Sequence, residues 1–196
     1  MDSIFHKFPK TMKKPLSFSK VKFAELNQVV KLVGIPDPQD TKFQEWFSYP
    51  YSFNETELLL LERLLTQHKL YVSTYSEEEL KAKLIIPILN SVEFMFGTVK
   101  DWYERPLKAV VNGVEIGGYV DFMVANGIKE PQRPYFFIQE FKKSRADVDP
   151  EDQLLAELLV AIELTQTTIM RGAYIIGKTW NFVILEKQLN GPYEYY

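Results

Sequence analysis

The sequence predicts an α/β fold in which a mixed central sheet is flanked by helices. The first observation is the order of its patterns: a helical stretch from residue 76, three strand-like runs, a long apolar helix and two further strand-like runs. The second is the pair Asn112-Gly113, a two-residue turn that joins two strands as a hairpin. The third is the composition, 196 residues of which 46% are hydrophobic and 25% charged, which is typical of a chain that buries a sizeable core.

Composition and charge exclude several classes of protein. The chain contains no cysteine, which excludes a disulfide framework and a cysteine-ligated zinc site. Its first residues hold no apolar run of signal-peptide length, and no stretch approaches the roughly 20 apolar residues of a membrane span. We therefore expect a cytoplasmic protein without membrane contact. The formal net charge of −3 argues against a nonspecific nucleic-acid coat, whereas a local basic patch would suffice for phosphate binding.

The chain is predicted to have two parts, an arm with a mainly helical extension over residues 1–72 and an α/β domain over residues 73–196. Residues 1–20 are basic and contain two prolines, which is typical of a flexible arm. Such an arm is either a solvated tail or a contact to nucleic acid or a protein partner. Residues 21–33 are expected to form a short helix that is ended by Gly34 and the proline that follows it.

An aromatic-rich segment follows at residues 42–53. Side chains of this kind either plug the edge of a core or stack on nucleic-acid bases, and we expect the first with the second as its alternative. The aromatic residues in question are Trp46, Phe47, Tyr49, Tyr51 and Phe53.

Capping signals predict the next two helices. Asn54 and Glu57 have the spacing of a capping box, so one helix begins there and ends near His68. Residues 70–74 are expected to form a short strand. The only other histidine is His6, so the chain cannot build a histidine metal cluster.

The second of these helices is expected to run from Ser76 to about Phe96. Ser76 and Glu79 again have capping-box spacing, and Pro87 implies a kink or a lost backbone hydrogen bond. Its apolar face is formed by Leu80, Leu84, Ile85, Ile88 and Val92.

Three strands and another helix come next. Residues 105–111 and 114–125 form the predicted hairpin, and Gly117-Gly118 suggests a bulge or a close approach of backbone or ligand. Residues 134–142 are the third strand. A helix is expected from the N-cap Asp149 to about Thr168, buried on nearly all sides and ended by Gly172. The runs GAYIIGK and WNFVILEK form the last two strands.

Charged residues at the ends of two apolar strands mark the candidate site. Asp121 ends one strand, while Glu140 and Lys142 lie two residues apart on the next, so the last two share a face. Carboxylates can bind a divalent cation, and a neighbouring lysine can orient water or neutralise phosphate charge. Mg²⁺ needs only one or two carboxylates, with water completing its shell, and the carbonyl of Phe141 is a plausible further ligand.

Two simpler readings stand beside this one. Asp121 could cap a turn, and Glu140 with Lys142 could be an exposed ion pair worth at most about 1 kcal/mol. The triplet Glu79-Leu80-Lys81 has the same carboxylate-x-lysine pattern but is expected on a helix, where residues two apart point away from each other. Lys143 and Arg145 either contact phosphate or belong to a solvated face.

Asp121 and Glu140-Phe141-Lys142, set in this order of elements, resemble the PD-(D/E)XK (restriction-endonuclease-like) nuclease superfamily over residues 76–187. The resemblance implies an αβββαβ core and Mg²⁺-dependent cleavage of phosphodiesters. It also implies that Glu77 supports the metal or water from the first core helix, and that Gln153 sits near the site.

The sequence departs from the family pattern at two positions. Glu157 stands where a tyrosine often follows the family's glutamine, here Gln153, by four residues. Val120 stands in place of the proline that precedes the family's aspartate.

The function expected from this pattern is that of a nuclease. A Mg²⁺-dependent or Mn²⁺-dependent hydrolase would cut DNA as an endo- or exodeoxyribonuclease, with Asp121, Glu140, Glu77 and the Phe141 carbonyl on the metal. Two alternatives remain: a catalytically inactive nuclease-fold module for nucleic-acid binding or protein assembly, and a protein-interaction domain that forms a homodimer or binds a partner through its N-terminal region.

Overall fold

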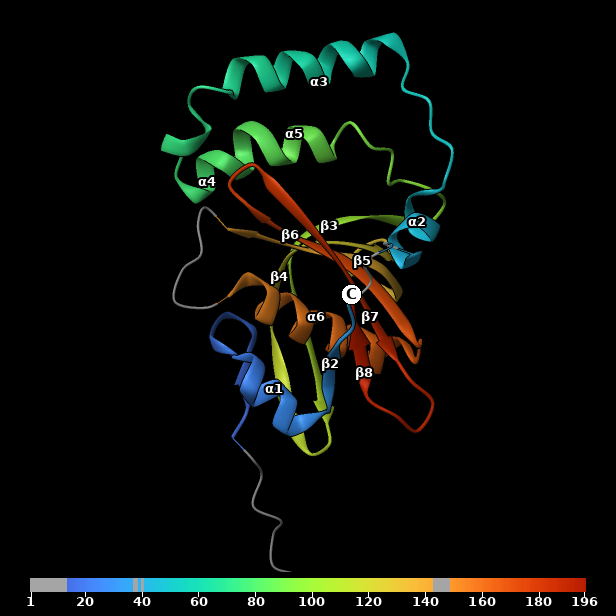
Figure 1. Cartoon of the computed structure of the whole chain (residues 1–196). Helices are drawn as coiled ribbons and strands as arrows, with labels where there is room; N and C mark the ends of the chain where they lie inside the picture. Colours follow the sequence, from blue (N-terminus) through green and yellow to red (C-terminus); the bar gives the residue numbers. More distant parts are fainter. Residues whose placement is uncertain (1–13, 37–38, 40, 143–148) are drawn as a thin grey trace, which may run out of the picture.

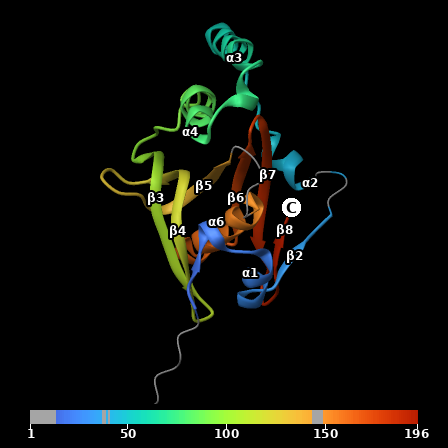
Figure 2. The same cartoon turned by 90° about the vertical axis from the view of Figure 1, so that its left-hand side faces the viewer.

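The computed structural model describes residues 14–36, 39, 41–142 and 149–196, and gives only the main chain for residues 134, 136–139 and 142. The fold is mixed α/β, as the sequence predicts. An eight-stranded sheet curls around one long helix, α6, while α4 and α5 lie outside the curl and α3 lies beyond them (Figures 1 and 2).

The sheet has the order β1-β4-β5-β6-β7-β8-β2, and β3 pairs with the other edge of β4. The β5–β6 pair is parallel, because the intervening α6 carries the chain back across the sheet, and the β3–β4, β4–β5 and β6–β7 pairs are antiparallel. The strands are β1 (Leu16–Ser17), β2 (Leu32–Gly34), β3 (Val99–Val111), β4 (Val114–Asn126), β5 (Gln132–Lys142), β6 (Ile169–Ile176), β7 (Thr179–Lys187) and β8 (Tyr193–Tyr195).

Helices cover both faces of the sheet. Asn54, Ser76 and Asp149 cap the N-termini of α3, α4 and α6, as the sequence predicts. None of the helices in the described part of the chain is long and apolar enough to cross a lipid bilayer. They are α1 (Phe23–Val29), α2 (Thr41–Phe47), α3 (Glu55–His68), α4 (Glu77–Leu80), α5 (Ile86–Leu89) and α6 (Pro150–Thr165), with short segments η1 (Phe18–Lys20), η2 (Val72–Thr74) and η3 (Lys81–Ile85).

Helix α6 is the centre of the larger core. Every residue from Leu154 to Ile162 is at most 1% exposed, which confirms a helix buried on all sides. It ends at Thr165, and its C-cap Gln166 adopts the left-handed conformation that closes many helices. The expected end at Gly172 is wrong, because Gly172 lies within β6 and pairs with Ile138 of β5.

The first described strand and helical segment belong to this core, so the expectation of a flexible arm is wrong for residues 16–20. Leu16 and Ser17 pair in parallel with β4, and Phe18 is 1% exposed. Residues 1–13 lie outside the described part. The expected close approach at Gly117-Gly118 is explained by this segment, because a Cβ at Gly118 would lie 2.9 Å from Cδ2 of Phe18.

The helix expected from Ser76 to Phe96 is shorter and irregular. It ends at Leu89, and Val92, expected on the apolar face, is 50% exposed. Within it, Ile86 donates its N–H to the carbonyl of Lys81, five residues back, which makes η3 a π-type segment just before Pro87. The strand expected at residues 70–74 is also wrong, since residues 70 and 71 lie in a turn and Val72–Thr74 form the 3₁₀ segment η2.

The aromatic segment lies on the outside of the molecule. Trp46 and Phe47 contact Phe182 of β7 edge-on, at centroid distances of 5.5 and 5.1 Å. Phe47 is 53% exposed and Tyr49 is 78% exposed, so the expected plug at the edge of a core is wrong for these two side chains.

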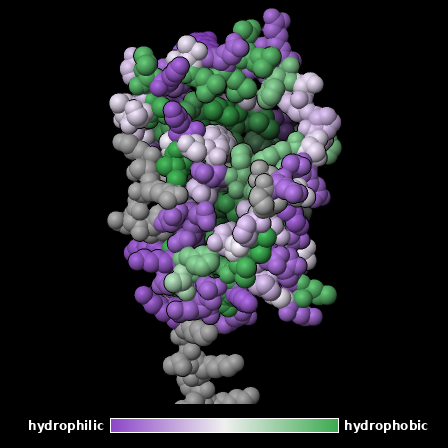
Figure 3. Space-filling model, viewed as in Figure 1, coloured by the Kyte–Doolittle hydropathy of each residue, from purple (hydrophilic) through white to green (hydrophobic). Residues whose placement is uncertain are grey.

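Helix α3 also presents apolar side chains to solvent. Leu58, Leu59 and Leu65 are 46%, 59% and 59% exposed, whereas Leu64 is buried. Figure 3 shows a hollowed, largely apolar surface where α3 and α5 face each other. An exposed apolar surface of this kind is typical of a site where another molecule binds.

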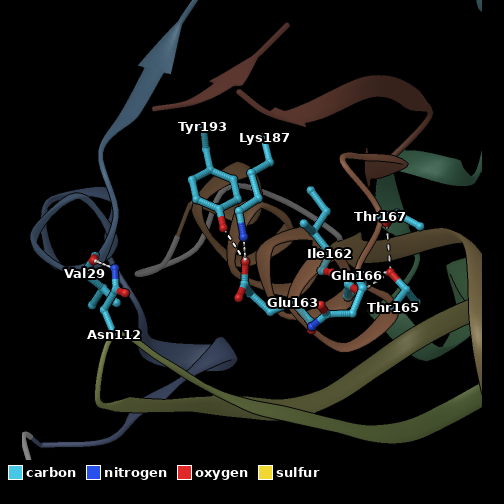
Figure 4. Close-up of polar contacts among 10 residues, drawn as sticks. Val29, Asn112, Ile162, Glu163, Thr165, Gln166, Thr167, Lys187 and Tyr193 are labelled. Carbon is cyan, nitrogen blue, oxygen red and sulfur yellow. Dashed lines mark hydrogen bonds and ion pairs between the residues drawn. The ribbon is translucent and has the colours of Figure 1, made fainter. Parts of the chain in front are cut away.

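Polar contacts tie the last strands to α6 (Figure 4). Glu163 of α6 accepts hydrogen bonds from Lys187 of β7 and Tyr193 of β8, and Asn112 in the β3–β4 turn donates to the carbonyl of Val29 at 2.8 Å. Burial and the hydrogen bond to Glu163 raise the pKa of Tyr193 to about 12, so its hydroxyl remains a donor at ordinary pH. These contacts hold β7 and β8 against α6, and α1 against the β3–β4 turn.

Replacing Tyr193 with phenylalanine is expected to destabilise the protein at neutral pH and to have less effect in acid. Burial works to raise the pKa of Glu163, but the hydrogen bonds from Lys187 and Tyr193 outweigh it and lower that pKa below its ordinary value of 4.5. A carboxyl with a lowered pKa stabilises the fold above its unfolded-state pKa, and this contribution is lost as the pH falls through the folded-state pKa.

Urea denaturation of wild type and Tyr193→Phe at several pH values checks this expectation. The difference between the two proteins should shrink as the pH falls below 4.5. Tyr119→Phe is the control, because Tyr119 is 68% exposed on β4 and should show no such pH dependence. A difference that stays constant into acid would contradict the role given to Glu163.

Candidate functional site

The candidate site lies where β4 and β5 separate. Their antiparallel register reaches Phe122 opposite Gln139. One residue further, the Asp121 carboxylate accepts the main-chain N–H of Phe141 at 2.8 Å, in the place where a regular sheet would have a carbonyl oxygen. The side chain of Asp121 is therefore held between the two strands.

In β3 and β4 the side chains stop alternating regularly between the two faces of the sheet, and this irregularity sets the position of Asp121. In β4, Ile116 and Val120 are buried in the core around α6, whereas further along it is Met123 that faces the same core. The alternation thus shifts by one residue between Val120 and Met123. Opposite Asp121, Glu104 of β3 has φ 48°, an uncommon conformation for a residue other than glycine. Irregularities of this kind re-aim side chains and are frequent beside functional sites.

Lys81 is the residue that the sequence reasoning missed. Its Nζ lies 3.0 Å from Oδ1 of Asp121 and 3.4 Å from Oε1 of Glu77. The side chain of Lys81 is 12% exposed, that of Asp121 is 18% exposed and that of Glu77 is 37% exposed. The signal was present in the spacing of Glu77 and Lys81, since residues four apart lie on one side of a helix.

The two carboxylates hold Lys81 in its charged form. Burial works to lower the pKa of Lys81, but the negative charges of Asp121 and Glu77 outweigh burial, and the pKa is raised above its ordinary value of 10.5. The Nζ also lies 5.9 Å from the ring centroid of Phe141. Lys81 is the first residue of the π-type segment η3, a feature that often marks functional positions in helices.

A pocket of about 380 Å³ opens beside this group. It is lined by Lys81, Asp121 and Phe141 together with Glu78, Tyr103 and Glu104. Burial is the main cause that raises the pKa of Tyr103 to about 12, so its hydroxyl stays protonated. That hydroxyl donates to Oδ1 of Asn90 at 3.5 Å, so the donor that stands beside the Asp121 carboxylate in the pocket is Lys81.

Glu140 lies on the other face of β5. Its partner in the parallel register is Tyr174, which belongs to the core around α6, whereas Phe141 pairs with Ile175 and both belong to the core under α4 and α5. Successive residues of a strand point to opposite faces, so Glu140 faces α6. It is 1% exposed.

Gln153 and Glu157 of α6 are buried polar residues in the same core layer. They are 4% and 0% exposed, and Nε2 of Gln153 donates to Oε1 of Glu157 at 3.1 Å. The residue that replaces the tyrosine of the family pattern is therefore a hydrogen-bond partner of Gln153. Lys142 pairs with Ile176 through its main chain, while its side chain, and all of Lys143 and Arg145, lie outside the described residues.

The predicted metal ligands are brought together only in part. Asp121 and Glu77 converge on one cationic nitrogen, with the Phe141 main chain adjacent, and Glu140 points to the α6 side. Within the described ranges, no group of three or more carboxylate or histidine side chains is placed to hold a metal ion. Two carboxylates that already bind a cation, beside a pocket open to water, are nevertheless a donor set that Mg²⁺ or Mn²⁺ accepts.

No family model matches the chain, and no curated protein matches it either.

Proposed function

We propose that this protein is a metal-dependent nuclease of the cytoplasm that hydrolyses phosphodiester bonds in DNA, built on a restriction-endonuclease-like core. The observation that carries the proposal is the convergence of Asp121 and Glu77 on one cation, the ammonium of Lys81. Asp121 and Lys81 line an open pocket where two strands separate. The order α4–α5, β3, β4, β5, α6, β6 supports the αβββαβ core that the resemblance implies.

The proposal assigns a separate role to each residue of the site. Asp121 and Glu77 would hold Mg²⁺ or Mn²⁺, and the N–H of Phe141 keeps the Asp121 carboxylate in place. When bound, such a metal polarises the phosphate and lowers the pKa of a water molecule. The orientation of that water is expected of Lys142, whose side chain lies outside the described residues. Because residues two apart on a strand share a face, Lys142 would, like Glu140, reach this metal only if the end of strand β5 rotates. Glu140 and Gln153 would support the site from the α6 side, with Glu140 reaching the metal only if strand β5 adjusts.

Cleavage by wild type and Asp121→Asn tests the proposal. Wild-type protein should cut plasmid DNA or a labelled oligonucleotide with Mg²⁺ or Mn²⁺ and stop on addition of EDTA. Asp121→Asn should cut at least about 100-fold more slowly, because a neutral amide keeps the hydrogen bond to Phe141 but loses the charge that holds the metal.

Glu115→Gln is the matched control, since it removes an exposed carboxylate from β4 outside the pocket beside Lys81. It should cut at the wild-type rate. Two results would overturn the proposal: no cleavage of DNA by wild type with either metal, or equal cleavage by wild type and Asp121→Asn.

A second candidate is an inactive nuclease-fold module for nucleic-acid binding or protein assembly. Two observations favour it. Lys81 contacts both carboxylates and offsets one of their two negative charges without a metal. The exposed leucines of α3 form a surface suited to a partner or a second copy of the chain. DNA binding that is unchanged in Asp121→Asn, measured by fluorescence anisotropy together with a cleavage assay that gives no product, would favour this candidate.

A further inference from the structure

The position of Lys81 raises a question about cation binding at the site. Both of its contacts are to carboxylates that the nuclease proposal assigns to the metal, at 3.0 Å to Asp121 and 3.4 Å to Glu77. The second oxygen of Asp121 is occupied by the N–H of Phe141. Oδ1 of Asp121 is the oxygen that remains for a metal, and this is the oxygen that Lys81 contacts.

We propose that Lys81 is a built-in competitor of the metal, whose ammonium group must leave Asp121 and Glu77 before a divalent cation can bind them. This inference rests on the proposed function for the identity of the cation, a divalent metal with oxygen ligands. Mg²⁺ binds oxygen at about 2.0–2.1 Å, so a metal on Oδ1 of Asp121 would stand where the ammonium stands now. Two positive charges at that separation also repel each other strongly.

The pocket beside Lys81 has room for its ammonium group when that group leaves the two carboxylates. Its side chain lines the pocket of about 380 Å³, so the ammonium can swing into open space without moving the helix. Glu78 lines the same pocket and offers another carboxylate. A displaced Lys81 would then face the volume in which a phosphate group would bind, and its positive charge would remain in the site.

Lys83 is a nearby lysine that forms a similar ion pair but has no contact with Asp121, so it serves as a comparison for Lys81. Lys83 also pairs with a glutamate four residues earlier, Glu79, at 2.7 Å. That pair is exposed, with both side chains 46% accessible, and Lys83 lies against the ring of Tyr75 rather than in the pocket. Removal of either lysine takes away one charge from the same helical stretch, but only Lys81 contacts Asp121.

Calorimetric titration of the full chain with MnCl₂, in the absence of DNA, tests the proposal. Lys81→Met should bind Mn²⁺ about tenfold more tightly than wild type, which corresponds to wild type having Asp121 free of Lys81 for roughly one tenth of the time. Lys83→Met should bind as wild type does. The double variant Lys81→Met with Asp121→Asn should lose the gain, because the metal would then lack its main ligand.

Equal or weaker Mn²⁺ binding by Lys81→Met than by wild type would overturn the proposal. Circular dichroism verifies that each variant is folded, and Lys81→Gln, which keeps a polar side chain, replaces Lys81→Met if the latter does not fold. The outcome is independent of cleavage. If Lys81→Met binds Mn²⁺ more tightly but wild type cuts no DNA, the role of Lys81 stands and the nuclease proposal fails. If wild type cuts DNA but Lys81→Met does not bind Mn²⁺ more tightly, the nuclease proposal stands and the role of Lys81 fails.

Discussion

Replacing Phe18 with alanine is expected to lower the free energy of unfolding by about 3–5 kcal/mol, although the residue lies in a segment whose sequence is typical of a flexible arm. Phe18 is 1% exposed and packs in the core around α6, so the substitution leaves a cavity that the surrounding strands cannot fill. For a chain of this size the loss corresponds to a drop of about 6–20 °C in the melting temperature.

Thermal and urea denaturation measure this effect, with Phe96→Ala as the matched control. Phe96 is 86% exposed, so its removal should change the free energy of unfolding by less than about 0.5 kcal/mol. A loss below about 1 kcal/mol for Phe18→Ala would show that β1 and η1 are not anchored in the core.

A double-mutant cycle with Gly118→Ala sharpens the test. A Cβ at Gly118 would come within 2.9 Å of the Phe18 ring, so Gly118→Ala alone should be destabilising. The same change should cost less in the Phe18→Ala background, where the ring is absent. Additive effects of the two substitutions would contradict the close approach of β4 and η1.

Replacing Phe122 with alanine is the second substitution with a large expected effect, again about 3–5 kcal/mol in the free energy of unfolding. Phe122 is fully buried under α5, and its ring contacts Phe94 and Tyr103 at centroid distances of 5.4 and 5.2 Å. Because Phe122 directly follows Asp121 in β4, the cavity would open beneath the candidate site.

Urea denaturation at neutral pH measures the effect of Phe122→Ala against Tyr119→Ala. Tyr119 is a large aromatic residue on the same strand but is 68% exposed, so its removal should change the free energy of unfolding far less. The prediction fails if the two variants are equally stable, since the rings under α5 would then contribute little to the fold.

Local rules predicted much of the fold. The capping boxes at Asn54 and Ser76 mark the starts of α3 and α4, and Asp149 caps α6 as its spacing to Pro150 predicts. The turn at Asn112-Gly113 has the positive φ values, 48° and 80°, that this dipeptide favours. In each case the decisive contacts are made by residues close in sequence.

The errors in the fold come from segments whose partners lie far away in sequence. Strands β1, β2 and β8 have two or three residues each, too few to show a period, and they form because distant strands offer them hydrogen bonds. Leu16 pairs with Ile116, and Leu32 pairs with Tyr193. The helix from Ser76 was predicted to be too long because the helical spacing of apolar residues persists past Leu89, where the helix ends in the structure.

The amino-acid sequence by itself determined the α/β fold class, the order of the main elements, and the placing of Asp121 and Phe141 on neighbouring strands. Only the tertiary structure decided that Lys81 reaches Asp121 from forty residues away, and that Glu140 faces α6 rather than the pocket. The physical reason is that caps, turns and periods act within a few residues, whereas an ion pair, or a one-residue shift in a strand's alternation, depends on which distant segments the fold brings together.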